Sequence, residues 1–161
     1  MKTINAFFCL IFLVALQPAL AQDESRIGGL LAYGTEIQNL GIGVNAEFPI
    51  AGKLTIAPSF IFYLPKDEAG VKINWFELNG NVNYYFVDQD GLGVYGLGGL
   101  NYSSVKVSAG GYSISDGQVG LNLGAGANFD IGSSVLPFAE LKYVIMNGGQ
   151  LVLAAGVKFS L

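Results

Sequence analysis

The side chains that could do chemistry are few, and the usual catalytic sets are missing. The 161-residue chain has no histidine and one cysteine, Cys9. Without histidine, a serine or cysteine nucleophile lacks its usual general base, and a metal site lacks its commonest ligand. Two carboxylates could still act as an acid–base pair, but no pattern places two of them together in a cleft. The sequence therefore predicts a non-catalytic protein with no cofactor and no metal.

Two glycine motifs match a nucleotide-binding pattern in spacing alone. Residues 91–96, Gly-Leu-Gly-Val-Tyr-Gly, fit G-x-G-x-x-G, and residues 41–46 fit its variant. That fingerprint needs a helix after it, whose N-terminus holds the pyrophosphate, and no helical pattern follows either motif. Asp88, Asp90 and Gly91 begin like a calcium loop, but the later ligands are missing. These motifs are better interpreted as parts of strands and turns.

The stretch 72–87 shows which elements must position the polar side chains. Its even positions are largely apolar and include Leu78, Val82 and Phe86, whereas its odd positions include Glu77 and Asn81. A strand sends successive side chains to opposite faces, so one sheet here meets two different environments. A soluble barrel would bury the apolar face, and a membrane barrel would turn it outward to lipid.

Composition favours the membrane barrel. Apolar residues make up 52% of the chain, charged residues only 12%, and there are 23 glycines. After the N-terminal segment, no apolar run reaches the roughly 20 residues that a spanning helix needs. High apolarity with alternation and abundant glycine is typical of a transmembrane β-barrel.

Residues 1–21 have the pattern of an export signal. Lys2 precedes an apolar run from Ile4 to Leu16, and Ala19-Leu20-Ala21 forms a small-x-small cleavage site. Cleavage would remove Cys9 and leave residues 22–161 as one domain. The chain carries 12 acidic and 8 basic residues with no basic patch, which argues against nucleic acid as a partner.

Eight alternating runs predict an eight-stranded antiparallel up-and-down barrel, all-β in class. We expect a β-bulge at Pro58, because proline removes a ladder donor. The longest connections are predicted at 65–70 and 107–117; outside loops on a rigid barrel carry recognition, so these are the predicted contact sites. The predicted strands are 26–34, 40–48, 53–64, 72–87, 92–105, 118–131, 135–146 and 150–161.

Aromatic residues set the orientation of the predicted barrel. Each even-numbered strand ends with an outward phenylalanine, and these four predict a periplasmic girdle: Phe48, Phe86, Phe129 and Phe159. A second group is expected near the opposite rim: Tyr33, Phe62, Tyr63, Phe76, Tyr102 and Tyr143.

Charged and amide side chains fall on the inner phase and predict a polar network that plugs the lumen. An eight-stranded barrel is only just wide enough for side chains to fill it, so buried charges must pair. If Met146 pairs with Gln150, Lys158 lies diagonal to Glu140, within reach of it. The functional alternative is a narrow ion or solute pore. The predicted lumen residues are Arg26, Glu47, Lys53, Glu77, Asn81, Asp130, Glu140, Lys142 and Lys158.

These features resemble the small eight-stranded outer-membrane barrels of Gram-negative bacteria, the OmpA/OmpX-like family. The resemblance covers the mature chain and rests on the architecture and on the last strand, which ends Gly156-Val-Lys-Phe-Ser-Leu161. It implies outer-membrane lipid and the barrel assembly machinery as partners, although family members commonly end in an aromatic residue and this chain has Phe159 two residues before its end. It also implies a role in envelope integrity or surface contact, without naming an extracellular partner. Alternatives from other classes are a soluble secreted lipocalin-like barrel that binds a small apolar ligand, and an outer-membrane enzyme.

Overall fold

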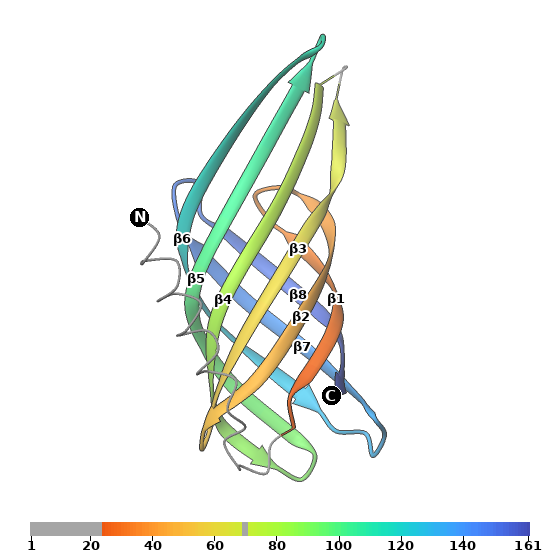
Figure 1. The fold of residues 1–161 in the computed structure, drawn as a ribbon, viewed down its shortest axis with the longest axis vertical. Coiled ribbons are helices and arrows are strands. Elements are labelled where there is room, and N and C mark those ends of the chain that lie inside the picture. The colour runs from red at the N-terminus through yellow and green to blue at the C-terminus, as the bar shows by residue number, and fades with distance from the viewer. Residues whose placement is uncertain (1–23, 69–70) are drawn as a thin grey trace, which may run out of the picture.

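The computed structural model describes residues 24–68 and 71–161, which form a closed antiparallel barrel (Figure 1). Each strand pairs with its sequence neighbours, and β1 pairs with β8 from Arg26↔Ser160 to Gly34↔Val152, which closes the sheet. The predicted fold class is therefore confirmed, while the predicted signal at 1–21 lies outside the described residues. The strands are β1 (Arg26–Gly34), β2 (Asn39–Ala51), β3 (Leu54–Glu68), β4 (Val71–Gln89), β5 (Leu92–Ala109), β6 (Tyr112–Phe129), β7 (Val135–Ile145) and β8 (Gln150–Ser160).

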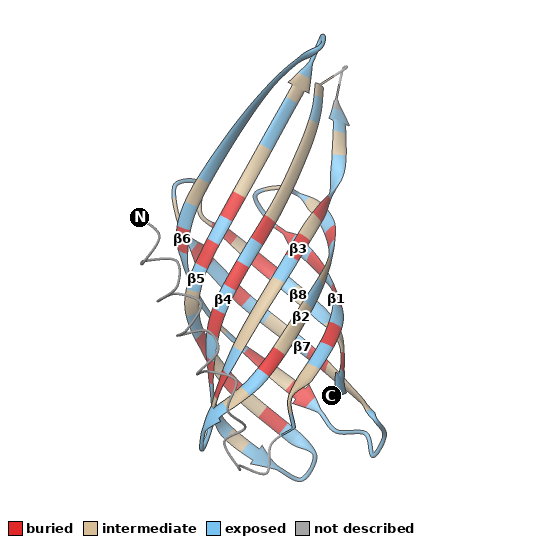
Figure 2. Cartoon of the chain, viewed as in Figure 1, coloured by how far each residue is buried: buried red, intermediate tan, exposed pale blue. Residues whose placement is uncertain are grey.

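Side chains alternate between the lumen and the outside, as the banding of buried and exposed residues along each strand shows (Figure 2). In β4, Glu77 is 0% exposed and its neighbour Leu78 is 53% exposed. The apolar phase points outward on every strand of the barrel wall, which is the reverse of a soluble protein. The lipocalin-like alternative requires that phase to point inward and is therefore wrong.

The two longest predicted loops are strands. β5 runs to Ala109 and β6 begins at Tyr112, so a two-residue turn replaces the loop predicted at 107–117. Gly110 and Gly111 both have positive φ, at 57° and 84°, a conformation that glycine adopts without a steric penalty. β3 likewise extends to Glu68 and β4 begins at Val71, where a loop at 65–70 was expected. The glycine- and serine-rich composition suggested loops, but the period-two alternation continues through both segments.

The longer strands give the barrel an uneven rim (Figure 1). The pairing of β3 with β2 ends at Tyr63, and that of β6 with β7 begins at Leu121, while β3, β4, β5 and β6 continue together beyond these points. We call this four-stranded projection the outer wall; it comprises residues 64–68, 71–76, 104–109 and 112–119. It stands at the end opposite the start of β1 and the end of β8, above the shorter β1–β2 and β7–β8 connections.

The predicted bulge at Pro58 is wrong. The pairs Asn45↔Ser59 and Phe48↔Ile56 on either side of Pro58 have the same register. Some pairs between them are missing, but neither strand has an extra residue. A bulge does interrupt β4 between Tyr85 and Val87. Beyond the bulge Gln89 pairs with Leu92, and Phe86 and Leu92 both stay on the outward face.

Two strand glycines of opposite orientation offer a stability test. A Cβ on the inward Gly156 would overlap the carbonyl oxygen of Gly29, whereas a Cβ on the outward Gly80 would meet nothing within 4 Å. We expect Gly156→Ala to lower the free energy of unfolding by about 1–3 kcal/mol, because the β1–β8 seam must separate to admit the methyl group. Gly80→Ala should change it by less than about 1 kcal/mol. Urea unfolding in lipid vesicles measures both, and equal effects would contradict this account.

Candidate functional site

The lumen near the termini is built around Glu47. Its Oε2 lies 2.7 Å from Lys158 Nζ, and both side chains are almost fully buried. Glu47 Oε1 accepts hydrogen bonds from the hydroxyls of Thr55 at 2.7 Å and Tyr85 at 2.6 Å. Lys158 also donates to Asn128 Oδ1 at 3.0 Å. This set of contacts joins β2, β3, β4, β6 and β8 across the barrel, and we call it the Glu47 centre.

A second centre, the Glu77 centre, lies further from the termini. Lys142 Nζ is 3.1 Å from Glu77 Oε2, with side-chain exposures of 3% and 0%. The Tyr63 hydroxyl donates to Glu77 Oε1 at 3.0 Å, and Gln150 donates to the same oxygen. Because Glu77 comes from β4, Tyr63 from β3, Lys142 from β7 and Gln150 from β8, these contacts also cross the lumen.

A ladder of amides surrounds the Glu77 centre. Asn79 Oδ1 accepts three hydrogen bonds, from Lys142 at 2.7 Å, Asn101 at 2.8 Å and Asn122 at 2.9 Å. Asn122 also donates to Asn81 Oδ1 at 2.8 Å. Alternation places these amides on the inner face of β4, β5 and β6, so the predicted polar ladder is brought together as a network.

The predicted approach of Lys158 to Glu140 is wrong. The register of β7 with β8 pairs Val144 with Gln150, so every partner lies two residues from the expected position and Lys158 lies opposite Leu136. Lys158 therefore reaches Glu47 on β2 instead. Glu140 accepts a hydrogen bond from the Tyr95 hydroxyl at 3.1 Å.

Three of the predicted lumen residues lie at the mouth of the barrel rather than in its interior. Arg26, Lys53 and Asp130 line a cavity of about 340 Å³ beside the Glu47 centre, at the end where β1 begins and β8 ends. Lys53 and Asp130 are solvent-exposed and lie just outside β3 and β6. The predicted set of nine thus divides into a buried network and a charged vestibule.

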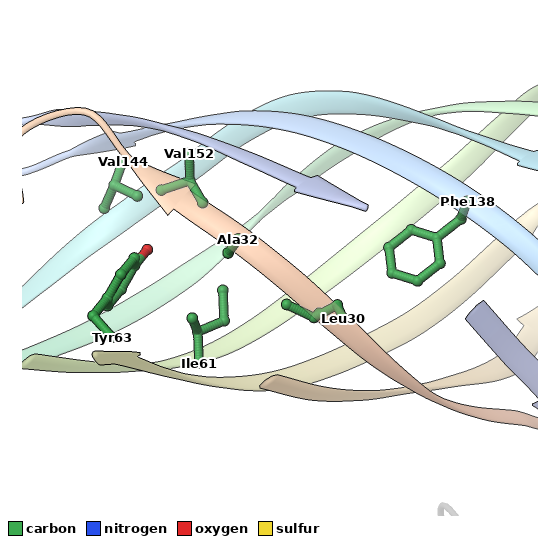
Figure 3. Packing of buried hydrophobic residues seen from close by; sticks show 7 residues of the cluster. All are labelled: Leu30, Ala32, Ile61, Tyr63, Phe138, Val144 and Val152. Carbon is green, nitrogen blue, oxygen red and sulfur yellow. The ribbon is translucent and has the colours of Figure 1, made fainter. Parts of the chain in front are cut away.

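Part of the interior is apolar, which the sequence interpretation missed. Figure 3 shows the cluster, which comes from the inner faces of β1, β3, β7 and β8. Tyr63 belongs to it and is fully buried, so within the group expected near that rim its side chain points into the lumen and not outward. The available signal was that 30–33, Leu-Leu-Ala-Tyr, is apolar on both faces of β1. The cluster comprises Leu30, Ala32, Ile61, Tyr63, Phe138, Val144 and Val152.

The aromatic residues on the outside mark two levels. Phe48, Phe86, Phe129 and Phe159 all point outward, with exposed fractions between 38% and 52%, near the C-terminal ends of β2, β4, β6 and β8. Toward the outer wall, the Phe76 ring lies 5.8 Å from that of Phe60 and 6.2 Å from that of Tyr102. The apolar surface between these levels is the surface expected to meet acyl chains.

The chemistry available to this arrangement is pairing and hydrogen bonding. Among residues 24–68 and 71–161, no group of three or more acidic, histidine or cysteine side chains could hold a metal ion. The same residues contain no helix long and apolar enough to cross a membrane. The two buried carboxylates at the centres each face a lysine and several neutral donors.

Comparison with models of known protein families shows which family the chain belongs to. Residues 7–159 match the model of the outer membrane protein beta-barrel domain. The chain belongs to this family. Membership of the outer membrane protein beta-barrel family places the protein in the outer membrane, with its apolar phase toward lipid. No curated protein matches the sequence.

Solved structures of outer membrane barrels share the fold at low sequence identity. The N-terminal β-barrel domain of Pseudomonas aeruginosa OprF aligns with a TM-score of 0.72 at 16% identity, over 87% of this chain and 98% of that one. Neisserial surface protein A aligns at 0.68 and 17%, over 85% and 96%. Ail, the attachment invasion locus protein of Yersinia pestis, aligns at 0.57 and 19%, over 84% and 97%.

Proposed function

We propose that this outer membrane barrel is a non-catalytic structural protein with a sealed lumen, which contributes to envelope integrity or surface contact through its outer wall. The observation that carries the proposal is the pair of buried ionic centres, each of which ties strands together across the lumen. Residues 1–21 are proposed as the export signal, and the C-terminal strand with Phe159 as the segment that the assembly machinery recognises.

The two centres support a seal because they block the lumen at two levels. An eight-stranded barrel has room for side chains and little else. Opening a path past Glu47 or Glu77 would separate a buried carboxylate from its lysine, which leaves both charges uncompensated in a poorly solvated interior. The apolar cluster fills the remaining width on the β1, β7 and β8 side. The vestibule at the mouth therefore ends at the Glu47 centre.

Planar-bilayer recordings test the seal. We expect the purified full chain to show no steady open conductance. Separating the buried carboxylate from its lysine at either centre would cost a large amount of free energy. The double variant Glu47→Ala/Lys158→Ala, which removes one centre and leaves the Glu77 centre intact, should also remain closed. A steady open level in the wild-type protein would contradict the seal and favour the narrow-pore alternative.

The outer wall supports the surface-contact part of the proposal, because it carries the longest strands beyond the barrel. Shortening the β5–β6 hairpin to a tight turn near Ser103 and Gln118 should leave a barrel whose mobility on a detergent gel still changes on heating. Cells with this variant should keep their resistance to detergent and lose adhesion. Unchanged adhesion would restrict the role to envelope integrity.

A further inference from the structure

The vestibule is a pocket with a polar floor at the mouth where β1 begins and β8 ends. Its volume of about 340 Å³ lies at the lower end of the range for small-molecule sites, roughly 300–1,000 Å³. The floor belongs to the Glu47 centre, so a molecule that enters from the mouth stops there. Four floor side chains are between 1% and 8% exposed: Glu47, Thr55, Tyr85 and Asn128.

The charged side chains that line the vestibule are separated by sign. Arg26 belongs to β1 and Lys53 lies between β2 and β3, whereas Asp88 is near the end of β4 and Asp130 directly follows β6. Because the sheet closes in sequence order, the two cations come from the β1–β3 arc of the mouth and these two carboxylates from the β4–β6 arc. Glu24, just before β1, is an additional acidic residue on the first arc. The vestibule therefore has a basic wall that faces an acidic one.

Backbone hydrogen bonds fix the segments that carry these charges. The Tyr85 N–H donates to the Lys53 carbonyl at 2.9 Å, which ties the β2–β3 turn to β4. The Asp130 N–H donates to the Gly91 carbonyl at 2.7 Å, which ties the β6–β7 connection to the β4–β5 turn. Asp130 Oδ1 also accepts from the Gly132 N–H at 2.8 Å. The two walls are thus held in place before any ligand binds, which lowers the entropic cost of binding.

The two cations of the basic wall have no carboxylate partner. Lys142 and Lys158 each contact a buried carboxylate, whereas within residues 24–68 and 71–161 neither Arg26 nor Lys53 forms an ion pair. A guanidinium matches the geometry of a carboxylate and can donate two parallel hydrogen bonds to it. The basic wall is therefore available to an anionic group of a ligand.

We infer that the vestibule binds a small zwitterion, an amino acid or dipeptide that carries a free carboxylate and a free ammonium group. Its carboxylate lies toward Arg26 and Lys53, its ammonium toward Asp88 and Asp130, and its apolar part against Leu136, whose side chain lines the same cavity. Short turns of outer-membrane barrels face the periplasm, so the ligand enters from that side. The inference goes beyond the proposed structural role and depends only on its closed floor.

Two other occupants fit less well. A simple anion such as phosphate would contact the basic wall but would also meet the carboxylates of Asp88 and Asp130 across a narrow mouth. A metal ion would be repelled by Arg26 and Lys53, and in the described part of the chain no group of three or more acidic, histidine or cysteine side chains could hold one. A zwitterion satisfies both walls at once.

The test uses the full chain in lipid nanodiscs and three dipeptides that differ only in charge. Isothermal titration calorimetry should show saturable binding of dialanine, with empty nanodiscs as the blank. N-acetyl-dialanine lacks the ammonium and dialanine amide lacks the carboxylate. Each should bind at least about tenfold more weakly than dialanine, because each loses charge-assisted hydrogen bonds to one wall.

Matched substitutions assign each charge of the ligand to its wall. Arg26→Gln should weaken dialanine binding about tenfold and change the binding of dialanine amide, which has no carboxylate to lose, by less than about twofold. Asp130→Asn, which keeps the acceptor for Gly132, should weaken dialanine binding at least about threefold and leave N-acetyl-dialanine within about twofold. Lys72→Gln on the outer wall is the control and should have no effect. Heat-dependent gel mobility checks that all three variants fold.

Three outcomes would overturn the inference: no saturable binding of dialanine, equal effects of Arg26→Gln and Lys72→Gln, or equal binding of the three dipeptides. If N-acetyl-dialanine binds as well as dialanine, the vestibule is an anion site, and if dialanine amide does so, it is a cation site; both results exclude a zwitterion site. Failure here is distinct from failure of the seal. A barrel that shows no conductance and binds no dialanine keeps its sealed lumen and loses only the ligand.

Discussion

Replacing Glu77 by glutamine should lower the free energy of unfolding by about 3–5 kcal/mol, the cost of removing one partner from a buried ion pair. Glu77 is fully buried, and its carboxylate accepts from Lys142, Tyr63 and Gln150. A glutamine at this position keeps the shape but leaves the Lys142 ammonium, itself 2% exposed, without a counter-charge. Urea unfolding in lipid vesicles, followed by tryptophan fluorescence of Trp75, measures the change.

A double variant separates charge from packing. Glu77→Gln/Lys142→Met removes both charges, and we expect it to recover more than half of the loss, because an apolar side chain no longer needs a carboxylate. Asp88→Asn, at the exposed end of β4 on the lining of the vestibule, should change stability by less than about 0.5 kcal/mol. If Glu77→Gln is as mild as Asp88→Asn, the Glu77 centre does not hold the barrel together.

The second large effect is expected on the outside of the barrel. Leu123 is 63% exposed and lies in the middle of the outward apolar belt of β6. Leu123→Arg should lower the free energy of unfolding by about 2–4 kcal/mol, the cost of an arginine on the lipid face near the bilayer midplane. The same vesicle assay measures it, and the fraction of chains that reach the heat-modifiable form should fall as well.

The matched control is Ser113, on the same strand but in the outer wall. Ser113→Arg places the same side chain on the outward face of the outer wall, in the row that also holds Lys72 and Ser108. We expect a change within about 0.5 kcal/mol, because this face meets water. A penalty at Ser113 as large as that at Leu123 would mean that lipid covers the wall and would place the membrane boundary higher.

The sequence predicted correctly which side chains of the barrel strands face the lumen and which face outward, because this depends only on whether a position is odd or even within its strand. A shift of two residues leaves every side chain on its predicted face. This is why Lys142 and Glu77 were placed in the lumen, although the β7–β8 register differed from expectation by two positions. Interpretation by composition was less reliable, since the glycines and serines at 107–117 belong to a regular hairpin with a Gly110-Gly111 turn.

Contacts across the lumen could not be predicted, because they depend on register and strand stagger around the whole barrel. The predicted partner of Lys158 was Glu140, the nearest acid on the neighbouring strand β7. Lys158 instead contacts Glu47 on β2, and β1 lies between β2 and β8 in the sheet. The apolar cluster was missed because residues such as Leu30 and Val152 lie on the inner phase, where polar side chains were expected.

The pairing of β1 with β8 also has a consequence for the order of assembly. The other seven ladders join consecutive strands and can zip as local hairpins, whereas Arg26↔Ser160 joins residues from the two ends of the chain. Contacts this distant in sequence form late, since the intervening chain must be ordered first. Until β8 is available, the sheet has two open edges, one of them at β1, and the barrel cannot close. A chain that lacks β8 would keep an unpaired, aggregation-prone edge at β1 instead of closing into a smaller barrel.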